Sequence, residues 1–206
     1  EINNNLLLAH EEGAFVIKDN SADKIYSFIG TWLFNPISVL NPSDNIIAGS
    51  YSGLHRITFK NGEFRDNGIM AGIKDPLRFT VYDAQSNTLW ASHPYRGVYK
   101  IELSPDFSKI NKCTLFTKKN GLPSSLYNYV FKIKNHIVIA TEKGIYEYNS
   151  DQKNFIPSPS LHGPLGNIPI QYLKEDPSGN IWFTTNKEVG VVDFNQHESG
   201  KPFTIV

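Results

Sequence analysis

The sequence predicts an all-β chain, a β-propeller of four-stranded antiparallel blades with about five blades in its 206 residues. One phrase recurs five times: an asparagine, an apolar run, a small residue, a polar loop, a glycine and a second apolar run. The glycines of this phrase are spaced by 40, 44, 47 and 46 residues, and they are Gly13, Gly53, Gly97, Gly144 and Gly190. The apolar runs are short and rich in Val, Ile, Phe, Tyr and Thr, which is typical of strands.

Each copy of the phrase is interpreted as the middle hairpin of one blade. The blades are expected at about residues 1–30, 36–69, 77–118, 126–159 and 168–206, with inner strands near residues 37–41, 78–83, 129–133 and 170–174. The segments between blades, such as GTWLFNP, are interpreted as linkers. A four-stranded sheet with two apolar faces is buried when blades stack around an axis. Trp90 and Trp182 take matching strand positions and are therefore expected in the core.

The two ends of the repeat pattern do not match. The first unit begins, at EINNNLLLAH, with what the repeat phase makes a second strand, and the last unit ends with an outer strand at Val206. We expect a fragment of a larger propeller; a closed five-bladed ring with one three-stranded blade is the alternative. In a fragment, the apolar strand at residues 6–9 and the face around Trp182 and Val191 would be uncovered. Self-association is then expected.

Composition excludes several classes of protein. Apolar residues make up 40% of the chain and charged residues 19%, which is typical of a globular protein. Twenty basic residues balance twenty acidic ones, so a nucleic-acid partner is not expected. The apolar runs are too short to cross a bilayer. Cys113 is the only cysteine, so an internal disulfide is impossible, and we expect a buried, unreactive thiol.

One segment resembles a known repeat. Residues 115–148, LFTKKNGLPSSLYNYVFKIKNHIVIATEKGIYEY, are similar to the two-component regulator propeller repeat. The linker of the repeat matches at Asn120, Gly121, Leu122, Pro123 and Ser124. The second strand of the repeat matches in the last blade, at Asn180, Ile181, Trp182 and Thr185. The third strand of the repeat matches in the fourth blade, at Gly144, Ile145 and Tyr146. The other linkers depart from the Asn-Gly-Leu-Pro pattern.

The resemblance implies a function for the chain. It would be a periplasmic sensor propeller of a Bacteroides-type hybrid two-component regulator that detects a glycan-derived oligosaccharide. The signal would pass to a histidine kinase in the remainder of the parent chain, and the parent receptor would be a homodimer. We expect no cofactor and no enzymatic activity in this segment, because its residues form no catalytic constellation; kinase activity would lie elsewhere in the parent chain.

Candidate ligand-binding residues lie in the loops between strands two and three and in the linkers between blades, which share one face of a propeller. The richest loop is HPYRG, where His93, Tyr95 and Arg96 surround a proline. Arg96 can bind a carboxylate or sulfate in a bidentate manner, and Tyr95 can stack on a sugar ring. The linkers add Trp32, Lys119 and His162.

Two alternatives to the sensor stay open. A protein-interaction propeller would use the same face for a protein partner. A metal-dependent propeller lactonase or lyase would need several converging acidic, Asn or His ligands. The local cluster His10, Glu11 and Glu12 is not enough for such a site. We therefore expect no catalytic and no metal-binding residues.

Overall fold

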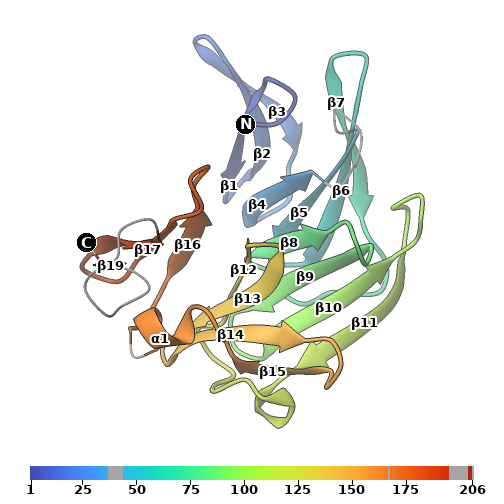
Figure 1. Cartoon of the computed structure of the whole chain (residues 1–206). Coiled ribbons are helices and arrows are strands. Elements are labelled where there is room, and N and C mark those ends of the chain that lie inside the picture. The colour runs from blue at the N-terminus through green and yellow to red at the C-terminus, as the bar shows by residue number, and fades with distance from the viewer. Residues whose placement is uncertain (37–43, 167, 195–203, 206) are drawn as a thin grey trace. The chain divides into compact units, whose positions relative to one another are not determined.

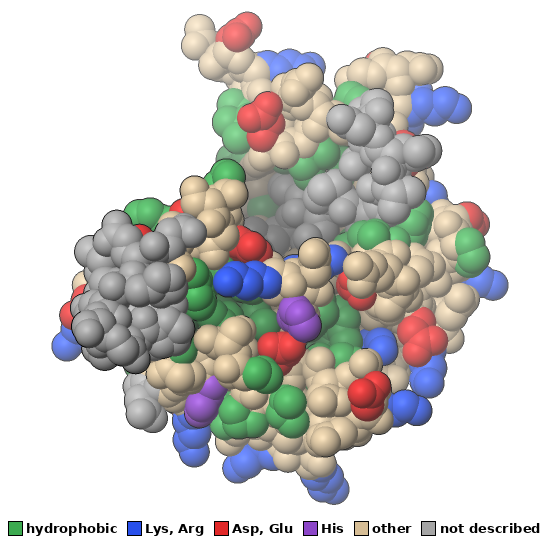
Figure 2. All heavy atoms as spheres, in the orientation of Figure 1, with side chains coloured by type: hydrophobic (Ala, Val, Ile, Leu, Met, Phe, Trp, Pro, Cys, Tyr) green, Lys and Arg blue, Asp and Glu red, His purple; other side chains and the backbone are tan. Residues whose placement is uncertain are grey.

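The computed structural model describes the backbone of residues 1–36, 44–166, 168–194 and 204–205. Within these residues the strands form five antiparallel sheets, four of four strands and one of three. In the described parts of the chain, helical structure is limited to the single turns η1 (Lys118–Asn120) and α1 (His162–Leu165). No helix among the described residues is long and apolar enough to span a membrane. Basic and acidic side chains are interspersed over the face seen in Figure 2.

The chain divides into two compact units. The first comprises Glu1–Pro94 and Tyr99–Leu115 and contains three sheets. Their strands are β1 (Leu6–His10), β2 (Gly13–Lys18) and β3 (Ser21–Tyr26); β4 (Thr31–Pro36), β5 (Asn45–Ser50), β6 (Gly53–Lys60) and β7 (Glu63–Ile69); β8 (Thr80–Asp83), β9 (Thr88–His93), β10 (Gly97–Leu103) and β11 (Ile110–Phe116). Each sheet follows chain order, and the leading strands β1, β4 and β8 contact one another in turn.

The second unit comprises Tyr95–Val98 and Phe116–Val206 and contains two sheets. Their strands are β12 (Tyr129–Ile133), β13 (His136–Thr141), β14 (Gly144–Asn149) and β15 (Asn154–Pro157); β16 (Tyr172–Glu175), β17 (Ile181–Thr184), β18 (Val189–Asp193) and β19 (Thr204–Ile205). The leading strands β12 and β16 contact each other (Figure 1). Consecutive antiparallel four-stranded sheets with adjacent inner strands are blades of a β-propeller, as the sequence predicts.

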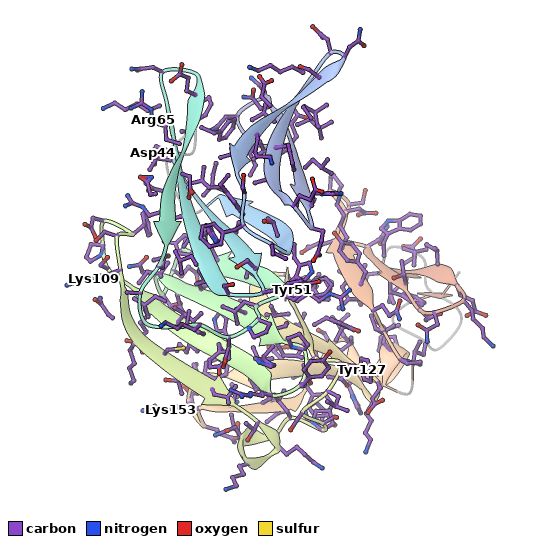
Figure 3. The ribbon with its side chains drawn as sticks, turned by 180° about the vertical axis from the view of Figure 1, so that it is seen from behind. Asp44, Tyr51, Arg65, Lys109, Tyr127 and Lys153 are labelled. Atoms are coloured by element: carbon purple, nitrogen blue, oxygen red, sulfur yellow. The ribbon has the colours of Figure 1, made fainter. Side chains whose placement is uncertain are left out.

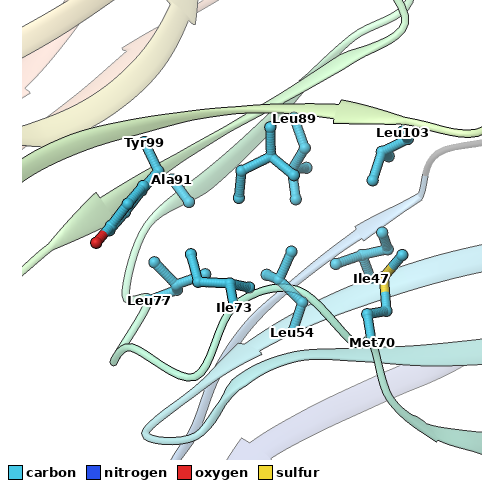
Figure 4. Close-up of a cluster of buried hydrophobic side chains, with 10 residues drawn as sticks. Ile47, Leu54, Met70, Ile73, Leu77, Leu89, Ala91, Tyr99 and Leu103 are labelled. Atoms are coloured by element: carbon cyan, nitrogen blue, oxygen red, sulfur yellow. The ribbon is translucent and has the colours of Figure 1, made fainter. Parts of the chain in front are cut away.

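The core of the first unit lies between its blades. Strand β5 is buried on both faces: Ile46 and Ala48 point to a cluster with Ala14 and Tyr26 of the first blade. Ile47 points the opposite way, into a cluster shared by the second and third blades (Figure 4); its other buried members are Leu54, Met70, Ile73, Leu77, Leu89, Ala91, Tyr99, Ile101 and Leu103. Burial of both faces explains the continuous apolar runs in the sequence.

Three of the predicted inner strands are confirmed, because β8, β12 and β16 overlap residues 78–83, 129–133 and 170–174. The first blade has three strands in the described part of the chain, and its repeat glycine Gly13 opens the second of them, whereas Gly53 opens the third strand of the next blade. The strand predicted at residues 37–41 lies outside the described residues. Instead, β4 occupies Thr31–Pro36, so the interpretation of this segment as a linker was wrong.

Trp90 and Trp182 differ in burial although their strand positions match. Trp90 is 2% exposed, as predicted, whereas Trp182 is 47% exposed, so its assignment to the core was wrong. In β17, Ile181 and Phe183 point to the buried face of the sheet, and Trp182 points to the opposite face. The matching residue of the preceding blade, Val138, is buried. Val138 and Trp182 therefore differ in burial although they occupy the same position in their blades.

Candidate functional site

The loops between strands two and three are supported by the last residue of the second strand. In the second blade, the Ser50 hydroxyl accepts the Ser52 amide (3.1 Å) and donates to the carbonyl of Gly53 (3.2 Å). In the fourth blade, Thr141 makes the same two bonds with the Lys143 amide (3.0 Å) and the Gly144 carbonyl (2.7 Å). These local bonds fix the backbone of the loop independently of the side chains at its tip.

The repeat glycine that ends each loop allows the next linker to pass close to it. Gly97 has φ +122°, and a Cβ added there would lie 2.1 Å from the carbonyl oxygen of Phe116. At Gly144, with φ +91°, the nearest atom would be the Gly166 carbonyl oxygen at 2.5 Å. The glycine therefore recurs because both its conformation and the packing of the linker exclude a side chain.

The linker NGLPS is also built from local bonds. Asn120 Oδ1 accepts the Thr117 amide (3.1 Å), and Thr117 Oγ1 accepts the Lys119 amide (3.3 Å), which together cap the turn η1. Gly121 follows in a left-handed conformation (φ 89°), and Leu122 is buried. The motif thus directs the chain from the outer strand of one blade to the inner strand of the next.

The predicted loop 93–96 divides into a buried and an exposed part. His93 is 4% exposed, so the expectation that it lies on the exposed rim was wrong. It is the last residue of β9, the position that Ser50 and Thr141 occupy in their blades, and it therefore belongs to the strand rather than to the loop tip. Tyr95 is 73% exposed, and Arg96 is exposed as well.

The three predicted linker residues have different surroundings. Trp32 lies in β4, packs edge-on against Tyr51 (ring centroids 4.7 Å apart), and has the Arg78 guanidinium 5.8 Å from its ring centroid. Lys119 is exposed on the turn η1. His162 starts α1, and its ring lies edge-on to that of Tyr146, 6.0 Å between centroids. Ligand binding by the six predicted residues stays a prediction.

A pocket of about 440 Å³ lies between the two blades of the second unit. It opens at the end of the blades where the strand two–three loops and the linkers meet. Its lining residues are Tyr127, Tyr129, Glu142, Pro169, Ile170, Gln171 and Asn186. Glu142 and Asn186 come from the loops that follow β13 and β17, and the others come from the segments that lead into β12 and β16.

Backbone and side-chain bonds hold the polar lining residues in place. The Gln171 amide donates to the Thr184 carbonyl (2.8 Å), and Gln171 Nε2 donates to Asn186 Oδ1 across the two segments. Tyr127, labelled in Figure 3, is 56% exposed and has φ +53°. The next residue, Asn128, is buried, and its Nδ2 donates to the Ser124 carbonyl (3.0 Å). This bond anchors the segment that presents both tyrosines.

The pocket has the chemistry of a polar organic ligand site. Two phenol groups supply flat apolar rings with one hydroxyl each, and the amides and the carboxylate supply hydrogen-bonding groups. Such a combination suits a sugar ring, which has an apolar face and a rim of hydroxyls. In the part of the chain that the structure describes, no group of three or more His, Cys, Asp or Glu side chains is placed to hold a metal ion.

The pocket lies at the end of the blades where the sequence places the candidate ligand-binding loops, but most of its lining residues were not among the candidates. Glu142 belongs to one of the loops expected to face a ligand. Tyr127, Tyr129 and Gln171 were missed because they precede or start inner strands, where alternating residues look like core positions. The available signal is topological, since the start of every inner strand lies at the same end of the blade as the strand two–three loops.

No family model and no curated protein matches the sequence. Solved structures do share its fold. One is the extracellular domain assigned to a hybrid two-component system of B. thetaiotaomicron, with a TM-score of 0.67 and 16% identity over 100% of this chain. A second is an auxiliary nutrient binding protein of Bacteroides thetaiotaomicron, with a TM-score of 0.61 and 10% identity over 98% of this chain. A third is the WD40 β-propeller domain of Doa1, with a TM-score of 0.58 and 14% identity over 95% of this chain.

These likenesses establish the propeller fold. The chain spans 28% of the length of the hybrid two-component structure, 53% of the nutrient binding protein and 62% of the Doa1 domain. Identities of 10–16% carry no residue-level equivalence.

Proposed function

We propose that this propeller is the ligand-recognition part of a periplasmic sensor of the hybrid two-component type, which binds a small glycan-derived oligosaccharide and signals to a histidine kinase elsewhere in the parent chain. The observation that carries the proposal is the pocket between the fourth and fifth blades. Its tyrosine rings, paired amides and single carboxylate match the needs of a sugar ring. The likeness to an extracellular domain assigned to a hybrid two-component system supports the sensor context.

The pocket also lies where binding can affect the arrangement of blades. Gln171 and Asn186 belong to the fifth blade, whereas Tyr129 and Glu142 belong to the fourth. A ligand that contacts both sides stabilises one spacing of the two blades, which is the differential contact that a sensor requires.

The test is calorimetry of the whole chain against a panel of neutral, amino and acidic oligosaccharides, with two matched variants. Tyr127→Ala should weaken binding of any active sugar about tenfold, because stacking on an aromatic ring contributes roughly 1.5 kcal/mol. Tyr95→Ala removes an even more exposed tyrosine outside the pocket and should leave affinity unchanged. Loss of binding in Tyr95→Ala alone would move the site to the 93–96 loop, and failure of every sugar to bind would remove the proposal.

A second candidate function, protein interaction, is favoured by one observation. Tyr172, Trp182 and Val189 are 45%, 47% and 70% exposed. Strand pairing places them on one face of the fifth blade, because Thr184 is opposite both Tyr172 and Val189, and Trp182 is opposite Val191. An apolar sheet face of this kind suits a protein partner, and a second copy of the chain is the simplest one.

The test of this second candidate is light scattering at rising protein concentration. The wild-type chain should self-associate, and Trp182→Ser should remain monomeric. A monomeric wild type would reject this candidate.

A further inference from the structure

We infer that the pocket selects sugars that carry an amino group and rejects uronic acids, an inference that rests on the function proposed above. It concerns the charge of the ligand, which the sequence analysis expected to be acidic because of Arg96. The residues that line the pocket indicate a positively charged ligand instead.

The charge of the lining comes from one residue. Glu142 is the only one of the seven lining residues with a carboxyl group, and none of them is Lys, Arg or His. A carboxylate favours an ammonium group nearby and disfavours a second carboxylate, and a charge-assisted hydrogen bond is stronger than a neutral one. A uronic acid would bring its negative charge towards Glu142 with no lining cation to compensate.

The backbone of the turn that carries Glu142 is held by the neighbouring Thr141. The Thr141 hydroxyl accepts the Lys143 amide (3.0 Å) and donates to the Gly144 carbonyl (2.7 Å). Lys143 and Lys187 lie in the same two loops, but they are exposed and do not line the pocket. Glu142 is exposed as well, but of these three charged residues it alone lines the pocket.

The paired amides add to the same preference. Gln171 Nε2 donates to Asn186 Oδ1, which uses one donor and one acceptor of the pair. Gln171 Oε1 is a further acceptor in the lining, to which Glu142 also contributes acceptor oxygens. A ligand that brings several N–H or O–H donors satisfies these atoms, and an ammonium group brings three. A carboxylate group brings none.

The test compares one sugar skeleton in three charge states. Glucose, glucosamine and glucuronate, together with their galacto counterparts, are titrated to high concentration into the whole chain and followed by NMR chemical shifts. For wild type we expect amino sugars to bind roughly 3- to 10-fold more tightly than neutral ones, the range for a partly exposed ion pair, and uronates more weakly than neutral ones. Glu142→Gln should abolish this ranking, so that amino sugars and uronates bind with affinities within about twofold of those of the neutral sugars in the same variant.

The control variant is Glu188→Gln, which removes an exposed carboxylate from the equivalent loop of the next blade, outside the lining. It should keep the wild-type ranking. Uronate binding as tight as amino-sugar binding, or a ranking unchanged in Glu142→Gln, would overturn the inference and leave the proposed function standing. Absence of any sugar-dependent shift would instead overturn the proposed function, and the inference with it.

Discussion

The imidazole ring of His55 stacks face to face on the phenol ring of Tyr26, with centroids 4.5 Å apart and ring planes within 9°. The Phe28 ring contacts the same imidazole at 4.3 Å between centroids, so aromatic rings of the first blade surround a histidine of the second. His55 is fully buried, and its Nδ1 lies 3.7 Å from Asp66 Oδ1, beyond hydrogen-bond distance. Burial lowers the pKa of His55, although the Asp66 carboxylate opposes this.

The buried histidine makes stability dependent on pH. Because the pKa of His55 is lower in the folded chain, the unfolded chain binds a proton at higher pH. Stability is then lost as the pH falls from the ordinary histidine range towards the lowered pKa of His55. In urea unfolding, His55→Phe should remove this part of the pH dependence. The control variant is His10→Ser, which replaces an exposed histidine with the residue found at the matching position 50. This variant should keep the pH dependence of the wild type. Equal pH dependence in wild type and His55→Phe would contradict the expectation.

The turn after β16 depends on one carboxylate. Asp176 Oδ1 accepts the amides of Ser178 (2.8 Å) and Asn180 (3.0 Å), and Oδ2 accepts Nε1 of Trp182 (3.1 Å). The bond from Trp182 and those from the turn lower the pKa of Asp176. Asp176→Ala should therefore lower the melting temperature and change the emission of Trp182.

The sign of the pH effect at Asp176 follows from its lowered pKa. The stabilisation is present above the ordinary carboxyl range and is lost as the pH falls through the lowered value. Asp176→Asn keeps one acceptor oxygen and should fall between wild type and Asp176→Ala in thermal melts. Unchanged emission and melting in Asp176→Ala would show that the turn does not depend on this side chain.

The repeat glycines should tolerate no side chain. Gly97→Ala would place a Cβ 2.1 Å from the Phe116 carbonyl oxygen at φ +122°. We expect a loss of at least about 3 kcal/mol in the free energy of unfolding. Gly163→Ala is the matched control, since a Cβ there meets nothing within 4 Å, and it should change stability by less than about 0.5 kcal/mol. Similar losses in the two variants, measured by chemical unfolding, would show that the close approach does not matter.

The single thiol should be slow to react in the folded chain. Burial raises the pKa of Cys113 to about 11, and the thiol packs at the margin of the core cluster of the second and third blades. At pH 8 the thiolate fraction should be about 100-fold below that of a thiol with an ordinary pKa. A disulfide reagent should react slowly with the native chain and rapidly in denaturant. The thiol is partly buried rather than fully buried as predicted, and equal rates in both conditions would show that this partial burial does not protect it.

The repeat phase was sufficient to predict the blades. The glycine and the two apolar runs of each phrase specify a hairpin through local chemistry alone, which explains why β13 and β14 lie where expected. Strand β4 was missed because Gly30 and Pro36 at its ends look like linker residues. Its extended conformation comes from pairing with β5, which no local pattern reveals.

The pocket could not be predicted in the same way. Tyr127 and Gln171 are far apart in the sequence, and only the packing of two blades brings their side chains to one cavity. The exposure of Trp182 has a similar cause, because its pattern matches that of Trp90 and only the neighbouring structure distinguishes them. Sequence periodicity reports which way a side chain points, and it does not report what covers it.

The hydroxyl bonds at the ends of the second strands have a consequence for how such a protein diversifies. Ser50 and Thr141 support their loops from the strand, so the loop backbone does not depend on the side chains at the tip. Substitutions at Ser52, Glu142 and Lys143 can therefore accumulate without loss of the framework, whereas Tyr51 also packs against Trp32. The loop between the second and third strands of such a blade can therefore change in sequence while the sheet stays the same. Transplanting the tip of one blade onto another offers a direct route to new ligand preferences in a designed receptor.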